Sequence, residues 1–321
     1  MNIKTILIMM GEPNSTFSEI LMKFFASKEF KRIKKKIVLI GSQNLFLQQM
    51  KKLKYKMSLN EISDIKYSKN KKINIINVDY KFKKTFNKIS NKSNEYIKNC
   101  FDKSLKIIKQ NKSICFINGP ISKKHFLKKK YPGITEYISN KTNSNNEVML
   151  IYNERLSVSP ITTHLPIKHV NKNINKKKII NNITKINNFF KLKLKKNPKF
   201  AVLGLNPHCE TTDKISEEKY KIIPAINYLR KKNFCIEGPF SADTFFSNKN
   251  IKKFDVVIGM YHDQVLTPIK TLFNFNAINL TIGLPFIRIS PDHGPNYEMI
   301  GKNKSDASSI FYAIKFLNRI S

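Results

Sequence analysis

Short apolar runs alternate with amphipathic stretches along most of the chain. The apolar runs are rich in β-branched and aromatic residues and predict buried strands over residues 5–10, 36–40, 73–78, 113–117, 148–152, 200–205, 254–260 and 277–282. Apolar positions at helical spacing predict helices over 17–25, 96–108, 179–192, 216–229 and 305–317. Alternation of this kind is typical of an α/β fold with mostly parallel sheets.

Several predicted strands end in a loop that is marked by glycine or proline. Such loops are Gly11-Glu12-Pro13, Asn118-Gly119-Pro120 and Asn206-Pro207-His208. Ligands of open α/β sheets bind at the carboxyl ends of the strands, so polar residues in these loops are candidates for a site. The sequence contains neither GxGxxG nor GxxxxGK[ST], and therefore gives no support for a Rossmann dinucleotide site or a P-loop.

The composition is globular but strongly basic. Of 321 residues 41% are hydrophobic, and the formal net charge is +37. A nucleic-acid partner is one interpretation of this charge, and a compositionally biased, solvated surface is the other. Only five of the 59 basic residues are arginines, and the lysines are dispersed along the chain. Recognition of phosphate and bases relies on arginine, so we favour the biased surface, whose field still attracts small anions.

The cysteines and the N-terminus suggest a cytoplasmic protein. Cys100, Cys115, Cys209 and Cys235 show no CxxC spacing, which is typical of reduced thiols in a chain of this size. The apolar run that ends at Gly11 is too short for a membrane span and lacks a small-residue cleavage site. We therefore expect no membrane association.

Three of the six histidines follow apolar runs, namely His164, His208 and His262. One imidazole at each of three strand ends could form a catalytic metal site, for which Zn²⁺ is the preferred ion and Co²⁺, Mn²⁺ or Mg²⁺ are alternatives. Each could instead be an ordinary loop histidine. His125, His169 and His293 lack the strand-end position.

Residues suited to an anionic substrate lie near His262. Lys270, Asn279 and Arg288 follow it in the sequence, and an arginine kept in a lysine-rich chain hints at bidentate recognition of carboxylate or phosphate. Lys270 alone could be a solvated charge. Asp243 and Asp263 could orient a histidine or handle a proton, or could cap a helix.

Five motifs together resemble the 4-hydroxythreonine-4-phosphate dehydrogenase family of pyridoxal phosphate biosynthesis. They are TTHLP (162–166), GLNPH (204–208), GPFSADTFF (238–246), MYHDQVLTPIK (260–270) and GLPFIRISPDHG (283–294). The resemblance implies the isocitrate/isopropylmalate dehydrogenase-like fold, with two α/β lobes and a central cleft, which binds NAD or NADP without a Rossmann fingerprint. We expect one lobe over residues 1–125 and 270–321, and a second, with the metal ligands and dimer contacts, over 126–269.

The resemblance also implies a reaction and a set of roles. Family members oxidise 4-phosphooxy-L-threonine to 2-amino-3-oxo-4-(phosphonooxy)butanoate, which loses CO₂ to give 3-amino-2-oxopropyl phosphate. The metal ligands correspond to His164, His208 and His262, supplied across a homodimer interface so that His262 serves the partner's metal. The substrate contacts correspond to the set Thr135, Lys270, Asn279 and Arg288. Asp243 and Asp263 are the candidates for proton transfer.

Two segments depart from the family pattern. Ile134 replaces a substrate-binding histidine, and the loop after Gly11 continues as Asn-Ser-Thr instead of a glycine-rich sequence. Isoleucine cannot donate a hydrogen bond to phosphate, a loss of roughly 1.5 to 3 kcal/mol. The alternatives are therefore a related dehydrogenase acting on another phosphorylated hydroxy acid, such as threonate or erythronate 4-phosphate, or a weakened member with nucleic-acid affinity.

Overall fold

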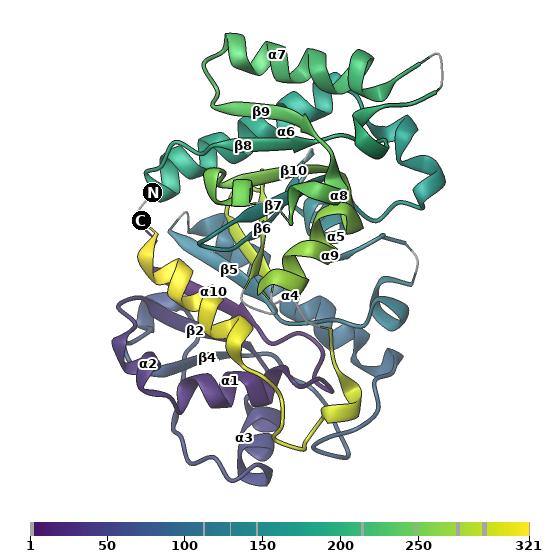
Figure 1. Ribbon diagram of the computed structural model, residues 1–321. Helices are drawn as coiled ribbons and strands as arrows, with labels where there is room; N and C mark the ends of the chain where they lie inside the picture. The colour runs from purple at the N-terminus through teal and green to yellow at the C-terminus, as the bar shows by residue number, and fades with distance from the viewer. Residues whose placement is uncertain are drawn as a thin grey trace. The chain divides into compact units, whose positions relative to one another are not determined.

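The chain forms two compact α/β units in a computed structural model (Figure 1). The first unit comprises Met1–Asn145 and Leu284–Ser321, and the second comprises Asn146–Gly283. The structure describes residues 3–111, 113–128, 130–145, 147–212, 215–247, 249–273, 277–290 and 294–320. The first unit is therefore built from both ends of the chain.

The first unit contains a parallel sheet. Its strands have the order β3-β4-β2-β1-β5-β12, and each described pair is parallel. The bounds are β1 (Thr5–Met9), β2 (Lys36–Gly41), β3 (Leu59–Glu61), β4 (Ile73–Asn77), β5 (Ile114–Asn118) and β12 (Ile287–Ser290). Because neighbouring strands point the same way, the loops that follow β1 and β5 lie at one edge of the sheet.

Helices cover this sheet and complete its core. They are α1 (Phe17–Phe25), α2 (Lys28–Arg32), α3 (Gln43–Lys52), α4 (Asn94–Gln110), α5 (Ile134–Lys141) and α10 (Ser308–Arg319). One core cluster joins β1, β2 and β5 to Phe101 of α4 and to Tyr137 and Ile138 of α5. The C-terminal helix α10 packs beside α1, where the rings of Phe24 and Phe311 meet at 5.2 Å (Figure 1).

The second unit contains a mixed sheet with the order β11-β6-β7-β10-β8-β9. Strand β6 is antiparallel to both of its neighbours, whereas β7, β10, β8 and β9 are parallel. The bounds are β6 (Val148–Tyr152), β7 (Ser157–Thr162), β8 (Phe200–Leu203), β9 (Ile236–Phe240), β10 (Val256–Tyr261) and β11 (Ile278–Ile282). Four adjacent parallel strands therefore end at one edge.

The helices of the second unit are α6 (Lys176–Phe189), α7 (Ile223–Lys231), α8 (Ala242–Phe245) and α9 (His262–Phe273). Its core cluster includes Val158, Leu203, Val257, Leu266 and Ile269, so α9 packs its apolar face against the strands. Within the described ranges, no helix is long and apolar enough to cross a membrane.

The predicted alternation of strands and helices is confirmed, as is the predominance of parallel pairs. The division of the chain falls later than the expected ends of the lobes at residues 125 and 269. Helix α5 stays with the first unit because Tyr137 and Ile138 are buried in its core. Lys270 stays with the second, because it belongs to α9, which packs on β7 and β10.

Candidate active site

Three histidines follow three adjacent strands of the second unit. His164 lies just after β7, His262 directly after β10 and His208 shortly after β8, and the order of these strands in the sheet is β7-β10-β8. Asp243 follows β9, the next strand along. The carboxyl ends of parallel neighbours share one edge, so the topology brings these four side chains to the same edge of the sheet.

Within this row the side chains form two close pairs. The ring centroids of His164 and His262 are 6.0 Å apart, and His262 Nδ1 lies 2.7 Å from Asp263 Oδ1. His208 Nδ1 lies 3.8 Å from Asp243 Oδ2. The hydrogen bond from Ser241 lowers the pKa of the Asp243 carboxyl, which is therefore ionised at neutral pH. The two His–Asp contacts each combine an imidazole with a carboxylate, as the outer partners of metal-binding histidines do.

The His208 loop is held from beneath by Glu218. One oxygen of this buried carboxylate accepts from Leu205 N at 2.8 Å and from Asn206 N at 2.9 Å. Burial acts to raise the pKa of Glu218, but hydrogen bonds, above all from Asn206, hold it below the usual value. These bonds fix the backbone just before His208. His208 itself has a φ of 54°, which lies in the left-handed region. The Glu218 carboxylate therefore fixes the backbone position from which the His208 imidazole projects.

Gln264 links two members of the row. Its amide nitrogen donates to Gly204 O at 2.7 Å, and its amide oxygen accepts from Met260 N at 2.6 Å. The side chain thereby ties the start of α9, which begins at His262, to the loop that leads to His208.

The donor set fits a divalent ion that accepts nitrogen ligands. Among the residues that the structure describes, no group of three or more His, Cys, Asp or Glu side chains has a metal-binding arrangement. One chain therefore presents His164 with His262, and separately His208 with Asp243. The His208 side chain is 74% exposed, so its ring is accessible from solvent.

A buried cation is the centre of the corresponding cluster in the first unit. The Arg288 side chain is fully buried and donates from Nε to Asn118 Oδ1 at 2.8 Å and from Nη1 to Thr135 Oγ1 at 2.7 Å. Burial lowers the pKa of Arg288 to about 10, and the charge of Glu136 acts in the opposite direction. The guanidinium is therefore cationic at neutral pH. The structure thus brings Thr135 and Arg288 of the predicted substrate set together.

The other predicted residues take no part in the contacts described above. Lys270 is exposed on α9, and Asn279 is half-buried on β11, where it pairs with Ile151 of β6. Ile134, which begins α5, packs against the core cluster of the first unit. Its position is therefore used for packing. His293 lies outside the described residues.

The loop after β1 packs closely against the loop after β5. Gly11 has a φ of 73°, and a Cβ there would lie 2.5 Å from Pro120 O, so this loop touches the loop after β5. Glu12 is buried and accepts from Asn14 N at 3.2 Å and from Ser93 Oγ at 3.0 Å. Burial raises the pKa of Glu12, while these bonds act to lower it. Glycine is thus required at Gly11, and the polar residues after it fill the space.

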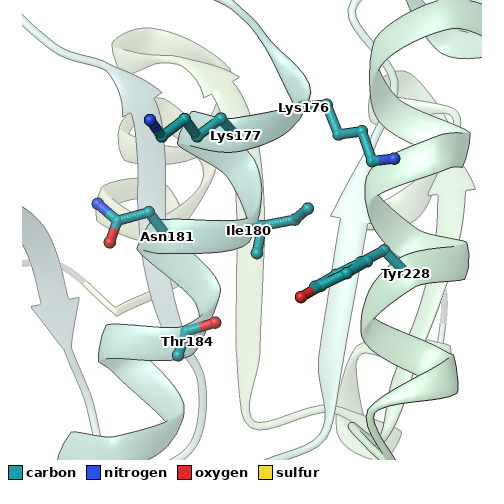
Figure 2. A pocket seen from close by; sticks show the side chains of 6 residues that line it. All are labelled: Lys176, Lys177, Ile180, Asn181, Thr184 and Tyr228. Atoms are coloured by element: carbon teal, nitrogen blue, oxygen red, sulfur yellow. The ribbon is translucent and has the colours of Figure 1, made fainter.

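An open groove of about 540 Å³ lies between α6 and α7, away from the predicted site residues (Figure 2). The ammonium of Lys176 is 5.9 Å from the centre of the Tyr228 ring, and the two side chains face each other across the groove (Figure 2). Its lining consists of Lys176, Lys177, Ile180, Asn181, Thr184 and Tyr228. None of the predicted ligands or carboxylates contributes to it.

The model of one protein family, "Pyridoxal phosphate biosynthetic protein PdxA", matches residues 33–317. The chain belongs to the PdxA family. A 4-hydroxythreonine-4-phosphate dehydrogenase of Sulfurihydrogenibium sp. (strain YO3AOP1) is 36% identical over 315 residues, which cover 96% of this chain and 95% of that protein. The family predicted from the motifs is therefore confirmed, and with it the class of enzyme, a dehydrogenase.

Solved structures agree with the PdxA assignment. The crystal structure of 4-hydroxythreonine-4-phosphate dehydrogenase from Klebsiella pneumoniae is 26% identical, covers 98% of each chain and gives a TM-score of 0.82. Isocitrate dehydrogenase from Methylococcus capsulatus shares the fold, with a TM-score of 0.52 at 9% identity, over 98% of this chain and 85% of that one. The predicted fold class is confirmed.

Three residues that position the candidate site were given no role from the sequence, namely Glu218, Gln264 and Asn118, of which only Asn118 lay in a loop marked as a candidate. Asn118 ends a strand next to Gly119-Pro120, which is the same signal that drew attention to His208. Gln264 lies within the MYHDQVLTPIK motif, but nothing in its spacing indicates a bond to Gly204, 60 residues away. No pattern in the sequence around Glu218 marks it, because it accepts hydrogen bonds from the separate loop at Leu205 and Asn206.

Proposed function

We propose that this chain oxidises 4-hydroxythreonine-4-phosphate (4-phosphooxy-L-threonine) with NAD⁺ or NADP⁺ in pyridoxal phosphate biosynthesis. The alcohol carbon C3 gives a hydride to the nicotinamide ring and its hydroxyl loses a proton, which leaves 2-amino-3-oxo-4-(phosphonooxy)butanoate. This β-keto acid then loses CO₂ to give 3-amino-2-oxopropyl phosphate. The observation that carries the proposal is the row of three histidines at adjacent strand ends in a PdxA-family chain.

His164, His208 and His262 would hold a divalent metal, with zinc preferred over cobalt or magnesium. When bound, such an ion supplies Lewis-acid assistance to the departure of the alcohol proton. Asp263 contacts Nδ1 of His262, which fixes the ring orientation and leaves Nε2 for a ligand. Asp243, which is exposed beside His208, would be the candidate that accepts a proton from the reaction.

The substrate carries a phosphate and a carboxylate, and the proposed contacts match these charges. Thr135 offers a hydroxyl that Arg288 supports, Lys270 offers an exposed ammonium, and Asn279 offers an amide. The formal charge of +37 adds a long-range attraction for the dianion.

We further propose that the active form is a homodimer in which His262 serves the metal of the partner. Exposed apolar side chains next to His164 support an interface there, because Leu165 is 39% and Ile167 is 70% exposed. The close approach of His164 and His262 within one chain would instead favour a site with both ligands from the same subunit.

Mixing two inactive variants separates these arrangements. If His262 acts in trans, a heterodimer of His208→Ala and His262→Ala contains one intact site, and random exchange of subunits restores about a quarter of the wild-type activity. If all ligands come from one chain, mixing restores nothing. A monomer by light scattering that retains full activity would overturn the dimer proposal.

The test of the reaction is direct. Purified protein is supplied with NAD⁺ or NADP⁺, with each divalent metal, and with 4-hydroxythreonine-4-phosphate, threonate 4-phosphate or erythronate 4-phosphate. We expect reduced cofactor and CO₂ from the first substrate. Formation of reduced cofactor from only one of the other two would assign the altered specificity to the Ile134 segment. No reduced cofactor from 4-hydroxythreonine-4-phosphate with any metal would overturn the proposal.

A further inference from the structure

The register of the sheet explains how Arg288 reaches its partners. β12 is parallel to β5, and Arg288 is the neighbour of Phe116. Asn118 lies two residues further along β5, on the same face, within reach of a long side chain. Its amide is oriented, because Nδ2 donates to Gly119 O at 3.2 Å while Oδ1 accepts from Arg288 Nε. Arg288 and Asn118 are 0% and 2% exposed, so both are shielded from solvent, whereas Thr135 is half-buried.

The bond from Arg288 determines what the Thr135 hydroxyl can do. Oγ1 accepts from the guanidinium, so its single hydrogen is directed elsewhere and remains a donor. Thr135 lies in the first turn of α5, where Gly133 provides no side-chain cap for the backbone N–H groups. A hydroxyl donor in the first turn of a helix, with a buried cation bonded to its oxygen, favours an anion, and a dianionic phosphate most of all.

We propose that Asn118 is a positioning residue for substrate binding, which holds Arg288 so that Arg288 directs the Thr135 hydroxyl toward the substrate phosphate. This inference rests on the proposed function. Arg288, itself one of the predicted substrate contacts, then also acts through Thr135, whose hydroxyl meets the phosphate. The buried amide of Asn118 thereby contributes to substrate affinity.

Steady-state kinetics of single and double variants test this chain of contacts. Asn118→Leu removes the acceptor for Arg288 and is expected to raise KM about tenfold for the phosphorylated substrate, with kcat changed less than about twofold. Asn118→Asp keeps an acceptor at the same place and is expected to restore KM. Thr135→Val removes the hydroxyl and is expected to raise KM about 10- to 100-fold, whereas Thr135→Ser should not.

The double variant separates positioning from general damage. If Asn118 acts through Thr135, adding Asn118→Leu to Thr135→Val raises KM no further, because the group being positioned is already absent. A purely structural role predicts that the two effects multiply. Asn60→Leu is the matched control, since it removes one amide hydrogen bond, to Asn74, in the same unit. It should change neither constant.

Two further readouts keep the test decisive. Unphosphorylated 4-hydroxythreonine should be used by wild type and Asn118→Leu with equal kcat/KM, because it lacks the group that Thr135 would meet. Inorganic phosphate binding, measured by calorimetry, should weaken in Asn118→Leu even if no substrate is turned over, so the inference can be tested independently of the reaction. An active wild type with an unchanged KM in Asn118→Leu would overturn the inference and leave the proposed function intact. Unfolding of Asn118→Leu would move the test to Asn118→Asp and Thr135→Val.

Discussion

The two groups of polar residues in this chain differ most in their exposure. In the second unit the side chains of His208 and Asp243 are 74% and 57% exposed, whereas in the first unit Arg288 and Asn118 are 0% and 2% exposed. A buried cation must be satisfied by its own chain, because leaving it without partners costs several kcal/mol. An exposed histidine has no such requirement and remains available to ligands from outside. The first group is therefore held by contacts within its own chain, whereas the side chains of the second are open to solvent.

This difference predicts different consequences of mutation. Loss of an exposed ligand should remove activity and spare the fold, whereas loss of the buried cation should damage the fold first. Four experiments test the contrast.

Replacement of His208 by alanine should have the largest effect. We expect kcat/KM to fall roughly a thousandfold or more, because a lost metal contact removes several kcal/mol of transition-state stabilisation. The melting temperature in the absence of metal should be unchanged, because the ring is exposed. Metal content by mass spectrometry and turnover are measured together. His169→Ala, an exposed histidine outside the row, is the control. Unchanged metal content and activity in His208→Ala would refute the ligand role.

Replacement of Arg288 by leucine should lower the free energy of unfolding by about 1 to 3 kcal/mol, the cost of leaving buried neutral acceptors without their donor. Asn118 and Thr135 would lose their donors. Urea denaturation measures the change. A midpoint equal to that of the wild type would mean that the buried cluster is not what stabilises this part of the first unit.

Replacement of Glu218 by glutamine should cost about 1 to 2 kcal/mol near neutral pH, because bonds to a charged acceptor become bonds to a neutral one. The folded pKa of Glu218 is depressed, so its stabilisation is present above the unfolded value of 4.5 and is lost as pH falls through the lower folded pKa. The difference from wild type should therefore shrink below pH 4.5. A difference that stays constant between neutral and acidic pH would contradict the anchoring role of the carboxylate.

Added salt should have the smallest effect. Between low and physiological ionic strength kcat/KM should fall about two- to fivefold, because salt screens the attraction of the positive field for a dianion. The value of kcat at saturating substrate should not change. Equal salt sensitivity of kcat and kcat/KM would place the effect inside the site instead of in the approach of substrate.

Much of the fold could be predicted because buried parallel strands are continuous apolar runs. The four strands that were missed among the described residues lack this signal. β3 has only three residues, β7 contains Ser157, Ser159 and Pro160, β9 contains Gly238-Pro239, and β12 has only four residues, of which one is Arg288. Helix α9 was missed because it begins immediately after β10 and contains Pro268. In each case the tertiary context outweighs the local preference.

The site was predictable only where it depends on chain position. His208 and His262 could be found because each follows a predicted strand, and His164 because it follows the short segment Ile161-Thr162-Thr163. That β10 lies between β7 and β8 could not be read from sequence order, so the pairing of His164 with His262 was not foreseen. The contact of Arg288 with Asn118 joins residues that are 170 positions apart, and it depends on the register of two strands.

The discontinuity of the first unit bears on the order in which the protein can form during synthesis. Residues 146–283 are a continuous segment, so the histidine row can assemble while the end of the chain is still within the ribosome. The strand with Arg288 and the helix that packs beside α1 follow this segment in the chain and emerge after it. Until β12 is in place, β5 is paired only with β1, and Asn118 lacks its bond to Arg288. During this interval the first unit has an unpaired sheet edge. Such an edge can pair with another chain, so this is the stage at which a chaperone would protect the protein most from aggregation.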